Sequence, residues 1–235
     1  MRGTNSRILY DYYDASMSTS EWEISSSVEE LEVPRIASDV MTYAPGNSDF
    51  SLTINGYIEG IESGFEEVLN SALNSGDRHV ALILDQTLIP ATAYVFVNAF
   101  ASEETWSVPF DGLMTLNGSV RGRSGGERGK CIYYNETSTA TGNEASVQVT
   151  TIAASDVGKA FLFLHGWTGT RSGNIGIEIQ SSPNNSTWTT IATFTMTEAR
   201  SQVEEVTFTG GYIRVNVSSL GGTTAINYSL VVSEN

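Results

Sequence analysis

One stretch of the chain, residues 59 to 74, predicts an amphipathic helix, and the sequence on both sides of it predicts β-strands. Ile61, Phe65 and Leu69 recur at four-residue steps, while Glu62 and Glu66 fall on the other side of the helix. Two early glycines lower its helix propensity, so the apolar stripe must be held by packing on a sheet. We therefore expect a mainly β fold with one α-helix packed on a sheet.

Three predicted strands, at residues 21 to 28, 50 to 58 and 113 to 123, alternate between polar and apolar residues. Two other segments, 80 to 84 and 94 to 100, are apolar on nearly both sides, as is typical of covered strands. The combination predicts a sheet with one hydrophilic face and one face covered by the helix.

The first of these strands leads into a long predicted loop. Apolar residues occupy even positions up to Val28 and odd positions from Leu31, which predicts a bulge near residues 28 to 30 or the end of the strand there. The loop, Pro34 to Ser48, is longer than a hairpin needs, and loops of this size are usually functional or disordered. Its apolar residues predict docking onto a partner, and they are Ile36, Val40, Met41 and Tyr43.

The charge of the chain restricts its partners. The formal net charge is -15, from 27 acidic and 12 basic residues, so the surface as a whole repels nucleic acid phosphates. Such a protein could guide DNA without gripping it. We expect the densest basic cluster to meet an acidic patch of another copy, and its members are Arg121, Arg123, Arg128 and Lys130.

No stretch has the 18 or so consecutive apolar residues that cross a bilayer, and the first residues do not resemble a secretory signal. We therefore expect a protein that is synthesised in a cytoplasm and has no membrane partner. The single cysteine, Cys131, excludes an internal disulfide and a cysteine-built zinc site.

A change of composition predicts a domain boundary. Residues 136 to 144 are rich in Thr, Ser and Gly, as linkers are. Residues 1 to 135 would form the first domain, and residues 145 to 235 would form a second. Seven short predicted strands without a helix favour a β-sandwich for the second domain, of the immunoglobulin-like or jelly-roll type.

No arrangement of residues predicts catalysis. His79 and His165 have no second ligand at metal spacing, so both are interpreted as structural, and we expect no metal site. The sequence around Gly129 and Lys130 departs from a phosphate-binding loop at two required positions. Adjacent acidic pairs, such as Glu103 and Glu104, point to opposite faces of a strand and are interpreted as solvated surface. We expect neither an enzyme nor a cofactor.

The order of elements over residues 5 to 130 resembles the major tail tube protein of long-tailed, siphovirus-like bacteriophages. The resemblance rests on an N-terminal arm, an acidic strand at Glu21 to Val33, the loop Pro34 to Ser48, the sequence DFSLTINGYIEG from Asp49 to Gly60, one helix, and long strands ending near Arg123. It implies that the N-terminal domain is a β-sandwich or barrel with one flanking α-helix. It also implies a structural virion protein of the tail, in which six subunits close into a ring and rings stack helically into a tube. The second domain would decorate the outside of the tube.

The resemblance also implies roles for individual residues and partners. The hydrophilic strand faces would line an acidic channel through which double-stranded DNA passes without specific binding during genome ejection, with the loop and the N-terminal arm reaching the next ring. Other partners would be the tape measure protein and the tail terminator and distal tail proteins. The expected lumen-lining residues are Glu21, Glu23, Thr53, Asn55, Thr115, Asn117 and Ser119. The expected inter-ring contacts are Ile36, Val40, Met41, Tyr43, Arg121 and Arg123.

An alternative of a different class is a capsid or tail decoration protein or a carbohydrate-binding adhesin. Trp167 and Trp188 of the second domain could stack on sugars, although tryptophans in sandwiches are more often core residues. A decoration protein, however, would not need three strands with a hydrophilic face beside a long apolar loop.

Overall fold

The computed structural model describes residues 5–33, 42–57, 69–70, 78–123 and 126–234. These residues are mostly in β-strands, which confirms the mainly β class. The chain divides into two compact units, which we call the sandwich unit and the ribbon unit. The sandwich unit comprises Met1–Met17, Arg78–Val95 and Glu127–Asn235, and the ribbon unit comprises Ser18–Asp77 and Phe96–Gly126.

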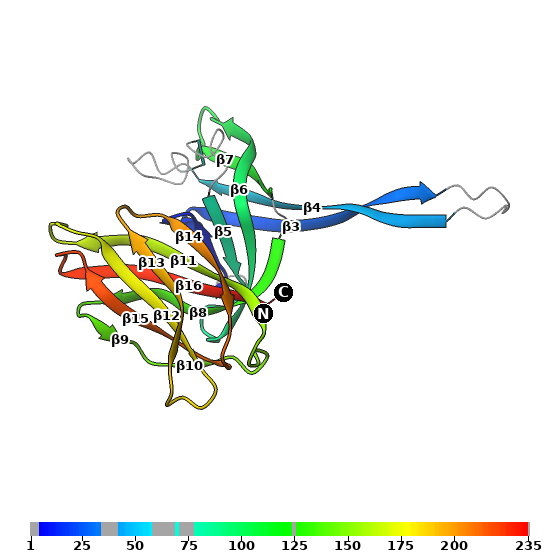
Figure 1. Ribbon diagram of the computed structural model, residues 1–235. Helices are drawn as coiled ribbons and strands as arrows, with labels where there is room; N and C mark the ends of the chain where they lie inside the picture. Colours follow the sequence, from blue (N-terminus) through cyan, green and yellow to red (C-terminus); the bar gives the residue numbers. More distant parts are fainter. Residues whose placement is uncertain (1–4, 34–41, 58–68, 71–77, 124–125, 235) are drawn as a thin grey trace. The chain divides into compact units, whose positions relative to one another are not determined.

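The strands of the sandwich unit come from three separate parts of the chain (Figure 1). They are β1 (Arg7–Tyr10), β2 (Tyr13–Asp14), β5 (Arg78–Ile83), β8 (Gly126–Ser138), β9 (Gly142–Asn143), β10 (Val147–Gln148), β11 (Val157–Thr168), β12 (Ile175–Ser182), β13 (Thr189–Met196), β14 (Ser201–Thr207), β15 (Tyr212–Leu220) and β16 (Ala225–Glu234), with a short 3-10 helix, η2 (Ala15–Met17). The ribbon unit holds β3 (Thr19–Val33), β4 (Thr42–Tyr57) and β7 (Thr115–Gly122), and β6 (Ala91–Ser107) begins in the sandwich unit and ends in the ribbon unit.

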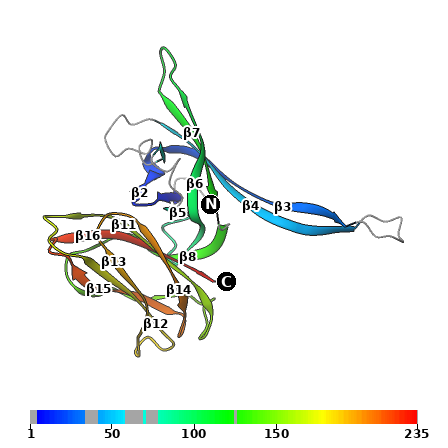
Figure 2. The same cartoon turned by 45° about the horizontal axis from the view of Figure 1, so that its top comes forward.

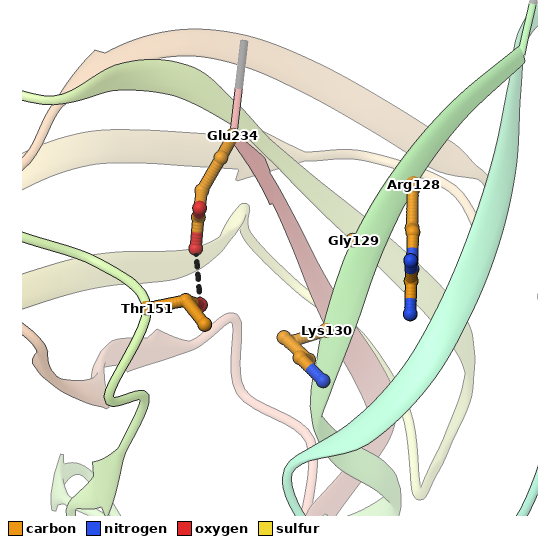
Figure 3. A pocket seen from close by; sticks show the side chains of 5 residues that line it. All are labelled: Arg128, Gly129, Lys130, Thr151 and Glu234. Carbon is orange, nitrogen blue, oxygen red and sulfur yellow. Dashed lines mark hydrogen bonds between the residues drawn. The ribbon is translucent and has the colours of Figure 1, made fainter.

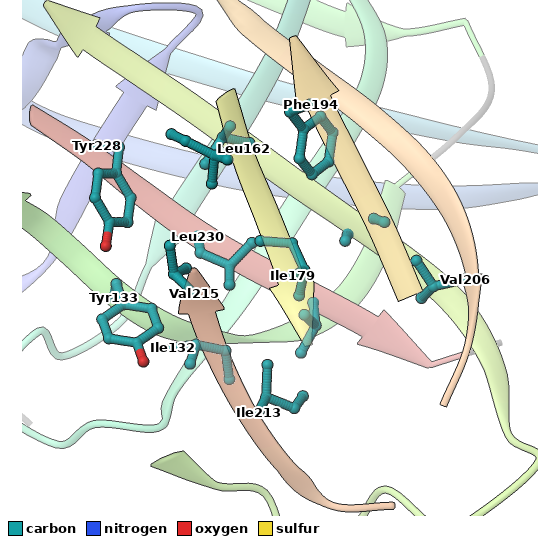
Figure 4. Packing of buried hydrophobic residues seen from close by; sticks show 14 of the residues in the cluster. Ile132, Tyr133, Leu162, Ile179, Phe194, Val206, Ile213, Val215, Tyr228 and Leu230 are labelled. Carbon is teal, nitrogen blue, oxygen red and sulfur yellow. The ribbon is translucent and has the colours of Figure 1, made fainter. Parts of the chain in front are cut away.

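Two sheets pack face to face in the sandwich unit. One sheet includes β14, β11, β16 and β8 as neighbours, and the other has the order β10-β15-β12-β13 with β9 beside β15. Alternate residues of both sheets point inward, as Ile175, Ile177 and Ile179 do, and are fully buried. Figure 4 shows Leu162 and Phe194 in the apolar core that the two sheets enclose. This architecture agrees with the sandwich predicted from the strand pattern.

The N-terminal segment belongs to the sandwich unit. The apolar sequence of β1 buries Ile8, Leu9 and Tyr10 completely, and β1 pairs antiparallel with β5. Residues 7 to 14 could have been an arm or a short strand from their sequence, and the structure shows a strand for Arg7–Tyr10. A contact between the N-terminal arm and a neighbouring ring stays a prediction. Ile8, Leu9 and Tyr10 are buried because these three consecutive apolar and aromatic side chains lie in a strand that pairs with β5 of their own chain.

A buried ion pair ties the N-terminal segment to strands far along the chain. Asp11 accepts hydrogen bonds from the backbone N–H of Ser201, at 2.5 Å, and from its hydroxyl, at 2.8 Å. The other carboxylate oxygen of Asp11 lies 2.5 Å from the Arg78 guanidinium. Because buried charges are stable only when paired and hydrogen-bonded, this cluster fixes the position of residue 11 against β5 and β14.

Both histidines have structural contacts within the sandwich unit. His165 bonds through Nδ1 to the carbonyl oxygen of Tyr12, at 2.9 Å, and through Nε2 to the hydroxyl of Ser229, at 2.8 Å. Since the desolvated ring loses the water that would stabilise its charge, the pKa of His165 is lowered. His79 is buried with its ring edge toward Phe161.

The ribbon unit contains part of the 11-stranded sheet, with the strand order β3-β4-β7-β6 and antiparallel pairing throughout. One face of it is apolar and buried, with Leu52, Ile54 and Leu116 at most 1% exposed. Leu69 and Asn70 are helical, and Leu69 is buried so closely against Gly118 that an added Cβ would lie 2.5 Å from its Cδ2. The remaining residues of the predicted helix lie outside the described ones.

The strands β3 and β4 extend far beyond the rest of this sheet. The strand β7 pairs with β4 only from Ser51 to Tyr57, whereas β3 and β4 pair as far as Val33 and Thr42. Figure 1 and Figure 2 show the resulting two-stranded ribbon. The prediction that residues 42 to 48 are loop is therefore wrong, because backbone pairing with β3 overrides their turn-forming composition. A register shift between Val28 and Glu30 confirms the predicted bulge.

The units differ from the predicted division at residues 136 to 144. The strand β8 continues through the expected linker as far as Ser138, which is buried and pairs with Ile226 of β16. Residues Ile132 and Tyr133 belong to the sandwich core, although they precede residue 135. The chain therefore does not fold as two successive segments, because the sandwich uses strands from both of them.

Candidate functional site

Pairing in the ribbon unit brings predicted site residues into rows across its sheet. Glu21 of β3 lies opposite Asn55 of β4, which lies opposite Asn117 of β7, and Thr105 of β6 completes the row. Directly opposed residues in antiparallel strands share a face, so these four side chains emerge together. The Asn55 amide donates to the Glu21 carboxylate at 3.5 Å.

A second row lies beside the first. It contains Glu23, Thr53, Ser119 and Glu103, one residue from each of the four strands. Thr115 emerges on the same face, opposite Tyr57. All seven residues predicted to line a lumen therefore lie on one face of one sheet, which we call the acidic face. Its members are Glu21, Glu23, Thr53, Asn55, Glu103, Thr105, Thr115, Asn117 and Ser119.

A bulge in β6 adds Glu103 and Thr105 to this face. Ala99 and Ala101 are buried, but the register shifts between Ala101 and Glu103, so the odd positions after the shift change faces. Sequence reasoning treated Glu103 only as half of a solvated acidic pair. The signal for its placement was the change from small apolar to polar residues at odd positions, the same kind of signal that predicted the bulge in β3.

Most side chains of the acidic face are accessible. Glu21, Glu23, Glu103, Thr105 and Asn117 are exposed. Arg121 also emerges there, opposite Ser51, although it was grouped with the expected inter-ring contacts. The face thus carries the carboxylates of Glu21, Glu23 and Glu103 beside the Arg121 guanidinium, while the opposite face is mostly apolar and includes Glu104. The excess of carboxylates makes this face repel anions.

The other expected inter-ring residues are placed only in part. Ile36, Val40 and Met41 lie outside the described residues. Tyr43 pairs with Glu32 in the ribbon. Arg123 is exposed, with its guanidinium carbon 5.6 Å from the centre of the Phe100 ring. The structure therefore shows that the ribbon exists but does not test its contacts.

The sandwich unit contains a small pocket of about 360 Å³ beside the end of β16 (Figure 3). Arg128 and Lys130 of β8 line it together with Thr151 and Glu234, and the Thr151 hydroxyl donates to the Glu234 carboxylate at 2.5 Å. This local mixture of charges includes half of the predicted basic cluster. It does not resemble a phosphate-binding loop, because Gly129 lies in a strand paired with β16.

Within the described ranges, no group of three or more His, Cys, Asp and Glu residues is arranged to hold a metal ion. In the same part of the chain, no helix has the length and apolar character of a membrane span. The Cys131 thiol is free and buried, and burial raises its pKa.

No protein-family model matches the sequence, and no curated protein matches it. Among solved structures, a chain from the virion of a native gene transfer agent particle is 11% identical, with 55% of this chain and 98% of that chain covered, at a TM-score of 0.45. A chain of the sheath–tube complex of an extracellular contractile injection system, in its extended state, is 12% identical over 52% and 86% of the two chains, at 0.42.

A third similar structure is the Dit protein of phage SPP1, which is described as a hub adsorption apparatus in phages that infect Gram-positive bacteria. It is 8% identical and covers 98% of this chain and 99% of that one, at a TM-score of 0.37. With TM-scores below 0.5, these likenesses do not assign the chain to a family.

Proposed function

We propose that this chain is a structural, non-catalytic subunit of a phage-type tail, in which six copies form a ring and stacked rings form a tube. The observation that carries the proposal is the acidic face, a polar surface that crosses four strands above a buried apolar face. A sheet of this kind suits the wall of a water-filled channel, because one face meets solvent while the other forms the subunit core.

Closure into a ring would also give the exposed edge strand of the sheet a pairing partner. Within the described residues, β3 pairs with β4 on one side and has no strand on the other. A long edge strand is an aggregation hazard, and a closed barrel removes such edges. Pairing of β3 with a strand of the neighbouring copy would extend the acidic face from one subunit to the next.

The expected size of the channel agrees with a DNA conduit. Six copies of a four-stranded sheet, with strands about 4.8 Å apart, give a backbone circle roughly 37 Å across before strand tilt widens it. After inward side chains are allowed for, a DNA duplex still fits. Carboxylates from Glu21, Glu23 and Glu103 would repel the phosphates, so the duplex would slide during genome ejection.

The ribbon would connect successive rings. Its outer part pairs only with itself among the described residues, so it has no support from the rest of its unit. We propose that the segment around its tip, with Ile36, Val40, Met41 and Tyr43, docks on the next ring. Arg121 and Arg123 would support that contact from the adjacent sheet. At the tube ends and inside the tube, the partners would be the tail terminator, distal tail and tape measure proteins.

The sandwich unit would remain outside the channel, because a domain of its size would block DNA. The protein would thus be located in the virion tail after synthesis in the host cytoplasm. If the chain instead stays monomeric, the alternative of a decoration protein or carbohydrate-binding adhesin would take precedence.

The test is negative-stain electron microscopy of the purified full chain. We expect hollow tubes or stacked rings in the full chain. A variant in which a short turn replaces residues 34 to 41 should give folded subunits or single rings without tubes. A gold-binding tag inserted at the exposed turn Asn184–Thr187 should decorate the outer wall. Monomers at every salt concentration, or gold within the channel, would contradict the proposal.

A further inference from the structure

The sheet β10-β15-β12-β13, with β9, differs from the rest of this acidic chain. Its five strands contain one acidic residue, Glu178, and one basic residue, Arg214, whereas the whole chain has 27 acidic residues. Both side chains point away from the core, because Ile177, Ile179 and Val215 beside them are buried. The solvent-facing side of this sheet is therefore electrically balanced.

Hydrogen bonds connect polar side chains along this side. The Arg214 Nε–H donates to the Gln180 side-chain oxygen at 2.8 Å, and the Asn216 amide donates to Glu178 Oε2 at 2.9 Å. The hydroxyl of Thr190 lies 3.5 Å from both the Gln180 amide nitrogen and Glu178 Oε2. These residues come from β15, β12 and β13, so the network crosses three neighbouring strands.

An aromatic ring borders the network. The Arg214 guanidinium carbon lies 4.0 Å from the centre of the Trp188 ring, which is half-buried. Stacking on the indole and bonding to Gln180 together restrict the Arg214 side chain. Ligand binding would therefore cost little side-chain conformational entropy, because these groups are already restricted. We call Glu178, Gln180, Trp188, Thr190, Arg214 and Asn216 the neutral face.

The neutral face keeps unused hydrogen-bonding capacity. Among the described residues, Glu178 Oε1, Asn216 Oδ1 and the terminal nitrogens of Arg214 make no further hydrogen bond. Acceptors and donors thus lie together on the outer side of three neighbouring strands, beside the half-buried Trp188 ring. Sugar hydroxyls both donate and accept, and a pyranose also presents C–H groups that pack on aromatic rings.

We propose that the neutral face binds a neutral oligosaccharide. The balance of one carboxylate against one guanidinium favours an uncharged ligand, and the acidic remainder of the chain disfavours an anionic one. Glu178 and Asn216 would bond to adjacent hydroxyls, and the accessible part of Trp188 would pack against the sugar ring. The inference does not depend on whether the chain forms rings.

Saturation-transfer difference NMR on the full-length protein tests this directly, because it detects weak ligands of large particles. The probes are neutral oligosaccharides built from glucose, galactose, mannose, rhamnose or N-acetylglucosamine, with trigalacturonate as an anionic comparison. We expect saturation transfer to at least one neutral probe and a weaker signal or none from trigalacturonate. Trp188→Ala and Asn216→Asp should each weaken binding of that probe about tenfold or more.

Arg171→Ala is the matched control. Arg171 also stacks on a tryptophan, with its guanidinium carbon 5.4 Å from the Trp167 ring centre, but Trp167 packs against the sandwich core. This variant should bind the probe as the parent does, and thermal unfolding should show that all variants are folded. The proposal is overturned if no neutral probe receives saturation, if trigalacturonate binds more tightly than every neutral probe, or if folded Asn216→Asp protein binds unchanged.

Discussion

The two units differ in how the faces of their sheets are covered. In the sandwich unit, two sheets cover each other, and an apolar core built from both is sealed within one chain. In the ribbon unit, a single sheet has one buried face, one polar face, and a ribbon whose outer pairs have no third strand among the described residues. The comparison teaches that the sandwich encloses its core within one chain, while the ribbon unit leaves a polar face and an unflanked pair of strands among the described residues.

The largest expected effect comes from ending the chain after Asn135. This truncation removes the strands that cover Ile132 and Tyr133 and leaves β1 without the Asp11–Ser201 bonds. We expect an insoluble or unfolded product rather than a smaller folded domain, because removal of most of one core leaves large apolar surfaces exposed. Circular dichroism and size-exclusion chromatography check this. A soluble product with native strand content would show that residues 1 to 135 are an independent domain.

Paired core substitutions would sharpen the comparison. Phe194→Ala in the sandwich core should cost about 3–5 kcal/mol, and Leu52→Ala under the acidic face about 2–5 kcal/mol. If the units unfold separately in guanidinium, each variant should shift only the unfolding transition of the unit that carries the substitution. Hydrogen exchange of the backbone amides in each unit measures these transitions. Equal shifts of one common transition in both variants would instead show that the units unfold as one.

A pH effect should be confined to the sandwich unit. Because burial lowers the pKa of His165, the unfolded chain binds this proton at a higher pH than the folded chain does. Its contribution to stability is thus complete above about pH 6.5 and declines as the pH falls, by at most about 1.4 kcal/mol per unit. Urea unfolding at pH 7 and pH 5 measures it. His165→Gln should reduce this dependence, and an unchanged slope would assign it to other groups.

The smallest effect on stability is expected from Glu21→Lys combined with Glu23→Lys. Both side chains are exposed, so the free energy of unfolding should change by about 0.5 kcal/mol or less. Tubes should still assemble, but DNA ejection should slow because the channel wall now attracts phosphates. Glu198→Lys combined with Glu204→Lys, at two exposed positions of the sandwich unit, is the charge-matched control. Normal ejection by the double variant would contradict the lumen assignment.

Local sequence patterns predicted those features of the fold that depend on residues close together in the chain, such as strand faces and bulges. Strict alternation placed Thr53, Asn55 and Asn117 on one face, and a parity change located the bulge after Val28. Pairing between distant segments left no such signal. The contact of Asp11 with Arg78 and Ser201, and the membership of β1 in the sandwich unit, depend on three-dimensional packing that alternation does not encode.

The predicted domain boundary differs from the observed division for a related reason. Residues 136 to 144 have the composition of a linker, but hydrogen bonding to β16 holds Ser138 in a strand. Composition indicates which conformations a segment prefers in isolation. Whether the segment becomes a linker or a strand depends on the strands that are available to pair with it. The same reasoning explains why Thr42–Ser48, with its Pro45 and Gly46, lies in the ribbon.

The bond between Asp11 and Ser201 joins residues 190 positions apart. At about 5–20 residues per second, a ribosome needs roughly 10–40 s between synthesis of the first and of the second. Throughout that interval the contacts of Asp11 with Ser201 cannot form, although β1 can already pair with β5, whereas β3 and β4 are complete early. The sandwich therefore cannot close until Ser201 has been synthesised, and a shorter fragment would be recognisable to chaperones and proteases by its incompletely covered N-terminal strand.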